Sequence, residues 1–233
     1  MTVENCGRSV TIEEPSRIVT SNTDPVYYVA AVGELDKIVA VAGLPSNTVF
    51  DEAIAAKIGK LPVLGGPEGA LSTEAILGTN ADLVIGTENN GGLTFEQLQT
   101  VGVPLLVTTG YCRAGGDTAG TDGRVDFTDI QNDIMFYGEL FGTEDHAKRS
   151  VANIQSRLAG VKNNLKPVTT ESTAAALFLS GDTLAAYGNQ SMSHTQFGLL
   201  GLRNVFAEVA DRHFEPTVEE IINRNPDFIE VLT

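Results

Sequence analysis

The sequence has few basic residues and no long apolar run. Its 233 residues include 15 Lys or Arg and 30 Asp or Glu, so the formal net charge is −15. Nucleic-acid binding requires a basic surface that neutralises phosphates, and no such cluster occurs, which argues against nucleic acid and other acidic partners. No run of about 18 apolar residues is present, so no segment is predicted to span a bilayer.

The first residues lack a targeting signature. Residues 1–6 contain no basic region followed by an apolar stretch. Two interpretations follow: either the protein is cytosolic, or a targeting segment is removed from its precursor.

Cysteine is scarce, because only Cys6 and Cys112 occur. Two unrelated buried thiols are one interpretation. The other is a single disulfide between the N-terminal segment and the loop after a strand, which would require an oxidising compartment. The residues alone leave both interpretations open.

The signatures of common α/β enzymes are missing as well. There is no Gly-x-Gly-x-x-Gly after a strand, no phosphate loop ending in Gly-Lys-Ser/Thr, and no Gly-x-Ser-x-Gly turn. Ser193 and His194 are adjacent, and side chains of neighbouring residues rarely point at each other. We therefore expect no catalytic residues.

Short β-branched runs alternate with helical stretches that begin at Ser or Thr and end at Gly. This pattern is typical of repeated βαβ units around a mainly parallel sheet, with helices on both faces. The predicted strands in the first half are 17–20, 37–41, 62–64, 82–85 and 104–108, and the predicted helices are 25–32, 52–58, 72–77 and 94–101.

The Gly- and Asp-rich stretch 111–125 interrupts this order and is predicted to be a loop. Apolar residues at helical spacing then predict a helix over 126–142 and another over 143–165. The βα pattern resumes with strands 174–179, 184–187 and 228–231 and helices near 195–200 and 218–224. The prediction is an α/β protein with an N-terminal lobe 1–125, a bridging helix 126–142 and a C-terminal lobe 143–233.

An internal match supports two similar lobes. Residues 74–84 align with residues 219–229 at a constant offset, and each copy has a helix beginning with a carboxylate, a turn containing Asn, and an Asp entering a buried strand. A glutamate in the first turn also suits the helix dipole, so the common grammar of αβ turns offers an alternative cause. We favour a duplicated lobe.

The order of several motifs resembles the substrate-binding proteins of ABC importers for ferric siderophores, haem and cobalamin. The motifs that carry the resemblance are Asn5-Cys6-Gly7-Arg8, residues 15–19, residues 71–77 leading to Asp82-Leu83-Val84-Ile85, residues 137–142, residues 201–206, and residues 218–222 with Asn225-Pro226-Asp227. The opening Asn-Cys-Gly with a second Cys after residues 102–104 is similar to the actinobacterial iron-siderophore branch. That likeness implies a Cys6–Cys112 disulfide.

The resemblance implies that a ferric siderophore is captured in a cleft between two lobes that a stiff helix joins, with no resident cofactor and no catalysis. Parallel α/β sheets bind ligands beyond the carboxyl ends of their strands. That rule selects Asn22, Asp24, Glu88, Asn89, Tyr111 and Arg113 in the first lobe, and Tyr187, Met192, His194, Arg212, His213 and Phe214 in the second. Aromatic rings would cover the apolar face of a chelate, and arginine would pair with its anionic oxygens. Several of these side chains have an alternative role as half-buried supports or ordinary surface charges.

The nature of the cargo has alternatives. A bare zinc or manganese ion is not expected, since only His146, His194 and His213 occur and His146 lies on the helix after the bridge. Haem stays open because Tyr111, Tyr187, Met192 or His194 offer axial-ligand chemistry. Cobalamin stays open too, and an enzyme of the same fold class is a more distant alternative.

The partner implied by the resemblance is an ABC permease dimer. Glu74 and Glu219 match the family's pair of surface carboxylates, one per lobe, that dock onto permease arginines. The resemblance further implies an extracytoplasmic location and a lipid anchor on a removed N-terminal cysteine. The family normally continues for some tens of residues after the strand at 228–232, so the C-terminal lobe is expected to be incomplete.

Overall fold

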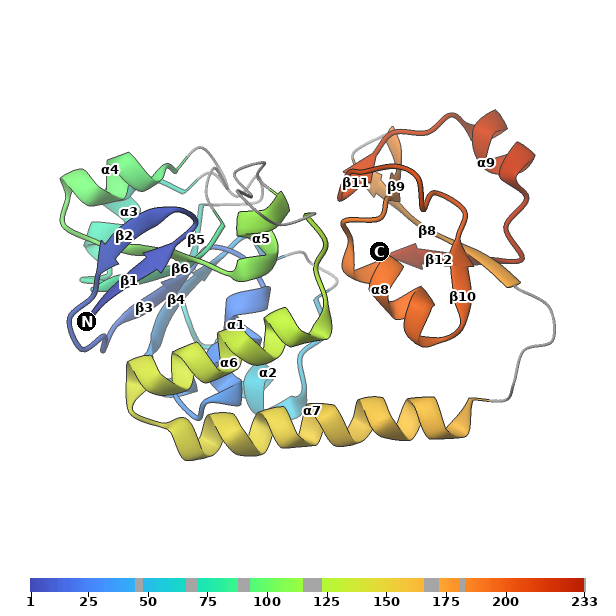
Figure 1. Ribbon diagram of the computed structural model, residues 1–233. Coiled ribbons are helices and arrows are strands. Elements are labelled where there is room, and N and C mark those ends of the chain that lie inside the picture. The colour runs from blue at the N-terminus through green and yellow to red at the C-terminus, as the bar shows by residue number, and fades with distance from the viewer. Residues whose placement is uncertain are drawn as a thin grey trace. The chain divides into compact units, whose positions relative to one another are not determined.

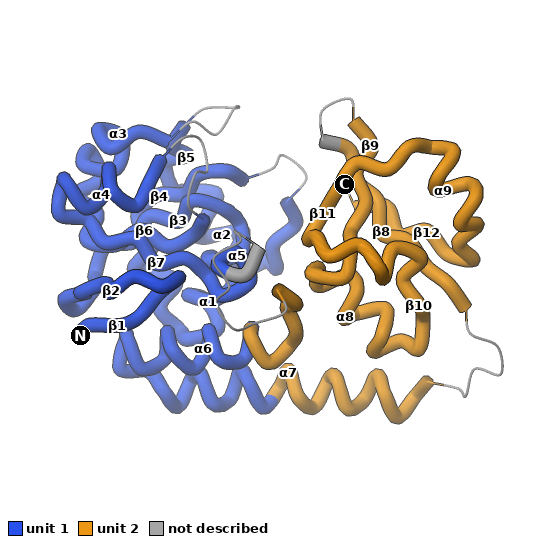
Figure 2. The backbone as a smooth tube through the Cα atoms, turned by 45° about the horizontal axis from the view of Figure 1, so that its top comes forward, with its two compact units in different colours: residues 1–112, 130–152 blue, residues 113–129, 153–233 orange. Residues whose placement is uncertain are grey.

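The computed structural model describes residues 1–44, 48–65, 71–87, 93–114, 123–165, 172–180 and 183–232. The chain divides into two compact units, shown in Figure 2: unit 1 contains Met1–Cys112 and Ile130–Ala152, and unit 2 contains Arg113–Asp129 and Asn153–Thr233. Within the described ranges, no helix is both long and apolar enough to cross a membrane.

Unit 1 is built on a parallel sheet with the strand order β5-β4-β3-β6-β7 (Figure 1). Its strands are β3 (Ile18–Thr20), β4 (Ile38–Ala42), β5 (Val63–Leu64), β6 (Leu83–Gly86) and β7 (Leu105–Val107). β3 and β6 are buried on both faces, which explains why their sequences are apolar throughout rather than alternating. The prediction of a parallel α/β sheet is confirmed here.

The helices of unit 1 begin and end largely where the sequence indicates. They are α1 (Asp24–Ala31), the 3-10 helix η1 (Leu35–Lys37), α2 (Glu52–Ile58), α3 (Thr73–Gly78), α4 (Phe95–Thr100), α5 (Thr109–Ala114) and α6 (Phe127–Phe141). Ser72 accepts the Ala75 N–H, and Thr94 forms a capping box with Gln97, so the predicted caps form. Ile76 and Leu98 attach α3 and α4 to one face of the sheet.

α1 and α6 lie together on the opposite side of this sheet (Figure 1), where the ring of Tyr28 is 5.8 Å from that of Tyr137. Tyr137 is fully buried, and burial, followed by the nearby Asp133, raises the pKa of its phenol well above the ordinary value. The phenol therefore stays neutral and serves as a core residue.

A two-stranded hairpin precedes the sheet and was not predicted. β1 (Thr2–Asn5) pairs antiparallel with β2 (Arg8–Thr11) through a two-residue turn in which Cys6 and Gly7 have φ angles of 51° and 73°. Consecutive positive φ angles are typical of the hairpin turns that match strand twist. The Cys6-Gly7 pair was the sequence signal that could have predicted this turn.

The helix α7 (Glu144–Asn164) contains the point at which the chain passes from unit 1 to unit 2, between Ala152 and Asn153. α6 belongs to unit 1 from Ile130 onward, although the sequence placed the bridge at 126–142. The close approach of α6 and α7 explains Gly138, because a Cβ there would collide with Ala147.

Unit 2 contains a mixed sheet. β8 (Ser172–Ser180) pairs in parallel with β10 (Leu202–Asn204) and β12 (Phe228–Leu232) and antiparallel with β9 (Thr183–Tyr187), which pairs with β11 (His213–Phe214). Only two residues join β8 to β9, which is too short for a parallel crossover. The helices are α8 (Met192–Leu199) and α9 (Val218–Arg224), with Phe197 and Ile221 packing on opposite faces of β8.

The internal match corresponds to a real structural repeat. Asn80 and Asn225 both adopt left-handed backbone conformations, with φ of 53° and 45°. Asp82 accepts hydrogen bonds from Ser16 at the start of β3, and Asp227 accepts them from Thr173 at the start of β8. Each aspartate thus fixes the beginning of the neighbouring parallel strand.

Two local predictions were wrong. Residues 111–114 are helical, not loop, because contacts with residues distant in sequence hold α5. The strand at 228–231 is not buried: Phe228, Ile229 and Val231 are 57, 53 and 65% exposed, since β12 pairs only with β8 among the described residues.

Candidate functional site

The first group of predicted residues lies where β3 and β6 end. The Ser21 hydroxyl accepts the Thr87 N–H at 3.0 Å, which links the two strand ends. A Cβ on Gly86 would collide with the Ser21 hydroxyl and come within 2.7 Å of Asn22 Oδ1, so glycine is required for this close approach. The loop carrying Asn22 is therefore held against the end of β6.

Asn22 presents a polar atom with no partner within the described part of the chain. Its Oδ1 is buried and accepts no hydrogen bond. The Oγ1 of Thr20, two residues earlier, is likewise buried without a partner in this part of the chain. Buried oxygens of this kind are uncommon and mark a place where a polar ligand would be favoured. Asp24 is exposed in the first turn of α1, whose N-cap residue Thr23 makes no side-chain cap.

Tyr111 and Arg113 lie on α5, directly after β7. Tyr111 is half-buried and packs partly against the core of unit 1, which agrees with a supporting role for part of its ring. Cys112 forms the predicted disulfide with Cys6, with their Cα atoms 5.1 Å apart. Glu88 and Asn89 lie outside the described residues, as does the side chain of Arg113.

In unit 2 the structure brings three aromatic side chains together. Tyr187 of β9 and His213 of β11 are cross-strand partners, and the ring of Phe178 on β8 lies 4.9 Å from Tyr187 and 5.8 Å from His213. His213 is exposed and Tyr187 is half-buried. The group offers an aromatic surface and two side chains able to coordinate iron.

Phe214 lies apart from this aromatic group. Its ring is 5.1 Å from that of Phe206 and it packs with the core on the other face of the sheet. Side chains of consecutive strand residues point to opposite faces, so Phe214 cannot share a surface with His213. The half-buried Arg212 precedes them, and its carbonyl accepts the Gly188 N–H at 3.2 Å.

Met192 and His194 lie in the first turn of α8, just after β9. The Ser191 hydroxyl caps the helix by accepting the His194 N–H at 3.2 Å. The imidazole Nδ1 is buried without a hydrogen-bond partner within the described residues, and burial followed by the charge of Arg124 lowers the pKa of His194. Metal-ligating imidazoles usually donate their second N–H to an acceptor. His194 lacks that support and is better suited to a neutral contact.

Glu74 and Glu219 occupy equivalent positions in the first turns of α3 and α9, and both are exposed. Hydrogen bonds from its own backbone N–H and from Ser72 lower the pKa of Glu74. It therefore stays ionised as a surface charge. Over the described ranges, no group of three His, Cys, Asp or Glu side chains is arranged to hold a metal ion.

Sequence reasoning missed Tyr27 of α1 and Phe50 in the segment before α2, whose rings lie 5.3 Å apart. The Tyr27 hydroxyl donates to the Val49 carbonyl at 3.0 Å, and burial, then Asp51 and Asp24, raise the pKa of Tyr27. The hydrogen bond and the ring contact join α1 to the segment before α2, while Tyr27 itself is 42% exposed. Phe50 lies between the predicted strand 37–41 and the predicted helix 52–58. Its place in a segment that follows a strand was the sequence signal that could have identified it.

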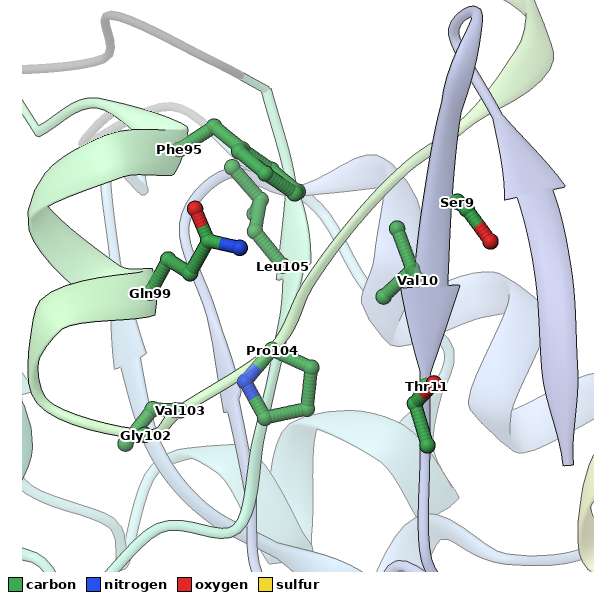
Figure 3. Close-up of a pocket in the computed structure, with 9 residues that line it drawn as sticks. All are labelled: Ser9, Val10, Thr11, Phe95, Gln99, Gly102, Val103, Pro104 and Leu105. Atoms are coloured by element: carbon green, nitrogen blue, oxygen red, sulfur yellow. The ribbon is translucent and has the colours of Figure 1, made fainter.

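A pocket of about 240 Å³ lies beside the beginning of β7, the edge strand of the sheet of unit 1. Figure 3 shows it between β2 and α4, with Val10, Phe95 and Pro104 around it. Because Pro104 precedes β7, this pocket is at the amino end of the strand and away from Asn22 and Tyr111. It does not belong to the candidate ligand site.

Residues 18–233 match the model of a family described as periplasmic binding protein. Among curated proteins, none is similar enough in sequence to count as a match.

Solved structures provide further similarity. An ABC-type Fe3+-hydroxamate transport system from Saccharomonospora viridis is 34% identical, with a TM-score of 0.84 over 100% of this chain and 79% of that one. The haem-binding protein RhuT from Roseiflexus is 24% identical, with a TM-score of 0.70 over 93% of this chain and 76% of that one. The haem-binding protein HutB of Vibrio cholerae is 19% identical, with a TM-score of 0.67 over 92% and 75%. The two haem-binding proteins share the fold.

Proposed function

The chain belongs to the periplasmic binding protein family, and we propose that it captures a ferric siderophore outside the cytoplasm and delivers it to an ABC permease. The observation that carries the proposal is the 34% identity, over the whole chain, with an actinobacterial Fe3+-hydroxamate transport protein. A ferric hydroxamate is therefore the chelate class that we favour. The family is one of binding proteins, so the protein is not an enzyme.

The chemistry at the strand ends supports a chelate rather than a bare ion. Asn22 offers a buried amide oxygen without a hydrogen-bond partner among the described residues, while Tyr111 and Tyr187 offer half-buried rings. A hydroxamate chelate has polar groups around the iron and hydrocarbon between its chelating arms, which suits this mixture of polar and aromatic contacts. In the parts of the chain that the structure describes, no group of three His, Cys, Asp or Glu side chains is arranged to bind a bare metal ion.

Haem is the second candidate, because one specific observation favours it. Tyr187 and His213 are cross-strand partners beside Phe178, so two residue types that ligate haem iron share one aromatic surface.

The proposed extracytoplasmic location suits the Cys6–Cys112 disulfide, because disulfides persist in oxidising compartments. A lipid anchor in the precursor completes this proposal.

A direct titration tests the proposed cargo. The purified protein is mixed in turn with a ferric hydroxamate (ferrioxamine B), a ferric catecholate, haem and cobalamin, and binding is followed by calorimetry and by quenching of tyrosine fluorescence. We expect a Kd of about 1 µM or tighter for the ferric hydroxamate, equivalent to about −8 kcal/mol. The iron-free hydroxamate is the matched control and should bind more weakly.

The other outcomes separate the alternatives. Haem binding with a shifted Soret band that His213→Ala or Tyr187→Phe abolishes would replace the siderophore with haem. Binding of cobalamin alone would overturn both iron proposals.

A further inference from the structure

The short helix α5 is held in place by contacts from distant parts of unit 1. It has six residues, Thr109–Ala114, and carries Tyr111, which the proposed function assigns to the ligand. An isolated helix of this length is not stable in water, because nucleation is unfavourable and few hydrogen bonds follow it. Its position must therefore be set by tertiary contacts.

The first contact fixes the beginning of α5. Asp133 of α6 accepts hydrogen bonds from the Thr109 N–H at 3.0 Å and the Thr109 hydroxyl at 2.5 Å. Asp133 is 7% exposed, so both bonds are shielded from water. This carboxylate caps the helix from a separate element.

The second contact comes from the hairpin β1–β2. The side-chain amide of Asn5 donates to the Val107 carbonyl at 2.8 Å and accepts the Val107 N–H at 2.8 Å. Val107 ends β7, the outermost strand of the sheet, and its backbone groups face away from β6. Asn5 thus satisfies both backbone polar groups of Val107 on the edge strand, two residues before α5 begins.

The third contact is covalent. Cys6 follows Asn5 in the tip of the hairpin, and its disulfide with Cys112 reaches the middle of α5. Cys6 has a φ of 51°, which is unusual for a residue with a side chain. The base of the hairpin is anchored separately, because Val10 and Ile12 are buried in unit 1.

We propose that the Cys6–Cys112 disulfide is a positioning element of the ligand site, through which the hairpin holds α5 and keeps the Tyr111 ring fixed at the end of β7. This rests on the proposed function. Asp133 holds the first residue of α5, and Tyr111 packs partly against the core of unit 1, so the disulfide is the covalent support of the turn that carries Tyr111. Reduction then lowers the affinity for the ferric chelate while the sheet of unit 1 stays folded.

The reductive step is an ordinary thiol–disulfide exchange with a dithiol. The S–S bond breaks, Cys6 and Cys112 each gain a hydrogen, and the dithiol is oxidised to its cyclic disulfide. Ligand affinity thereby becomes dependent on the redox state of the surroundings.

A double-mutant cycle tests this positioning role. The variants are Cys6→Ser with Cys112→Ser, Tyr111→Ala, and all three together, and the ligand is the gallium(III) complex of desferrioxamine B, which reductants do not reduce. We expect Kd to rise about tenfold for the cysteine pair and for Tyr111→Ala, with no further rise in the triple variant, as for coupled residues. If the triple variant showed the product of the two separate rises in Kd, the effects would be independent and the proposal would be wrong. An unchanged Kd in the cysteine variant would also overturn it.

Two further measurements keep the test decisive. Asp82→Ala destabilises the same unit at the amino ends of the central strands β3 and β6 and should leave Kd unchanged, so a Kd rise there equal to that of the cysteine variant counts against positioning. If the cysteine variant does not fold, the wild-type protein is reduced with dithiothreitol and desalted without oxygen before titration.

The proposed function and this inference fail separately. If the wild-type protein binds no chelate, the proposed function is wrong, and the NMR signals of the Tyr111 ring in the unliganded protein decide the inference. One sharp set of signals that broadens on reduction supports it, and signals unchanged by reduction overturn it.

Discussion

Asp82 and Asp227 perform the same task in the two units, at positions that the internal repeat relates. Asp82 accepts the Ser16 N–H at 2.9 Å and the Ser16 hydroxyl at 2.7 Å, and it also accepts the Arg17 N–H at 2.9 Å. These bonds give acceptors to the backbone N–H groups of Ser16 and Arg17, which directly precede β3. The aspartates are therefore conformational residues rather than ligand residues.

We expect Asp82→Ala to lower the free energy of unfolding by about 1–2 kcal/mol, because three hydrogen bonds to the half-buried carboxylate are lost together. Urea denaturation measures the change. Asp145→Ala is the control, since that side chain is 86% exposed and only 3.5 Å from Lys148, and should have an effect within about 0.5 kcal/mol. Equal losses for both variants would contradict the assigned role.

His194 gives the fold a pH dependence whose sign follows from its lowered pKa. Burial disfavours the imidazolium, so the unfolded chain takes up a proton at a higher pH than the folded protein. Above the ordinary pKa of about 6.5 the His194 imidazole is neutral in both the folded and the unfolded chain, so its protonation does not reduce stability. Stability then falls as the pH drops below about 6.5, until the folded imidazole is protonated too.

The expected result is that His194→Gln loses less thermal stability than the wild type between pH 7.5 and pH 5.5. Thermal unfolding monitored by circular dichroism at both values measures this. A wild-type protein that becomes more stable relative to the variant on acidification would show that the imidazolium is favoured in the fold.

Among the elements, the contact between the ends of β3 and β6 depends on a glycine. A Cβ on Gly86 would displace Ser21 and Asn22, which lie in the loop after β3. We expect Gly86→Ala to lower the free energy of unfolding by about 1–3 kcal/mol through overpacking, and to raise the Kd for the chelate. Urea denaturation and calorimetry measure the two effects.

Gly160→Ala is the matched control for that substitution. Gly160 lies inside α7 with nothing within 4 Å of the added Cβ, so the same change should stabilise the protein by about 0.5–1 kcal/mol. If both variants changed stability in the same direction, the close packing at Gly86 would not be the cause.

Helices and strands with local start and stop signals were predicted well. The Ser72 and Thr94 caps and the apolar runs of β3 and β6 place their elements within a residue or two. The mixed sheet of unit 2 was not predicted, because parallel and antiparallel pairing depends on the connection between strands rather than on strand composition. α5 was missed because its stability comes from Asp133 and Cys6.

For the whole molecule, the repeat supplies one exposed carboxylate per unit, and we propose that this pair docks on the permease. Glu74 and Glu219 lie in equivalent first helical turns, and separate charges set orientation and encounter rate on a partner. We expect Glu74→Arg with Glu219→Arg to leave the Kd for the chelate unchanged and to abolish permease-dependent uptake. Uptake of iron-55-labelled chelate in cells measures it.

Glu52→Arg with Glu144→Arg is the charge-matched control, because both side chains are exposed in the first turns of α2 and α7. This pair should retain uptake. Survival of transport in the Glu74 and Glu219 variant, or equal loss in the control, would remove the docking role from the repeat.

The sequence by itself determined the α/β class, the repeat and most element boundaries, since caps, glycine stops and apolar runs act over a few residues. It also determined which loops follow strands, and therefore most of the candidate ligand residues. Only the tertiary structure decided that Tyr187 and His213 share a surface while Phe214 packs in the core, because that depends on strand pairing and sheet faces. It likewise decided that the hairpin reaches α5, because residues 106 positions apart meet only after the chain has folded.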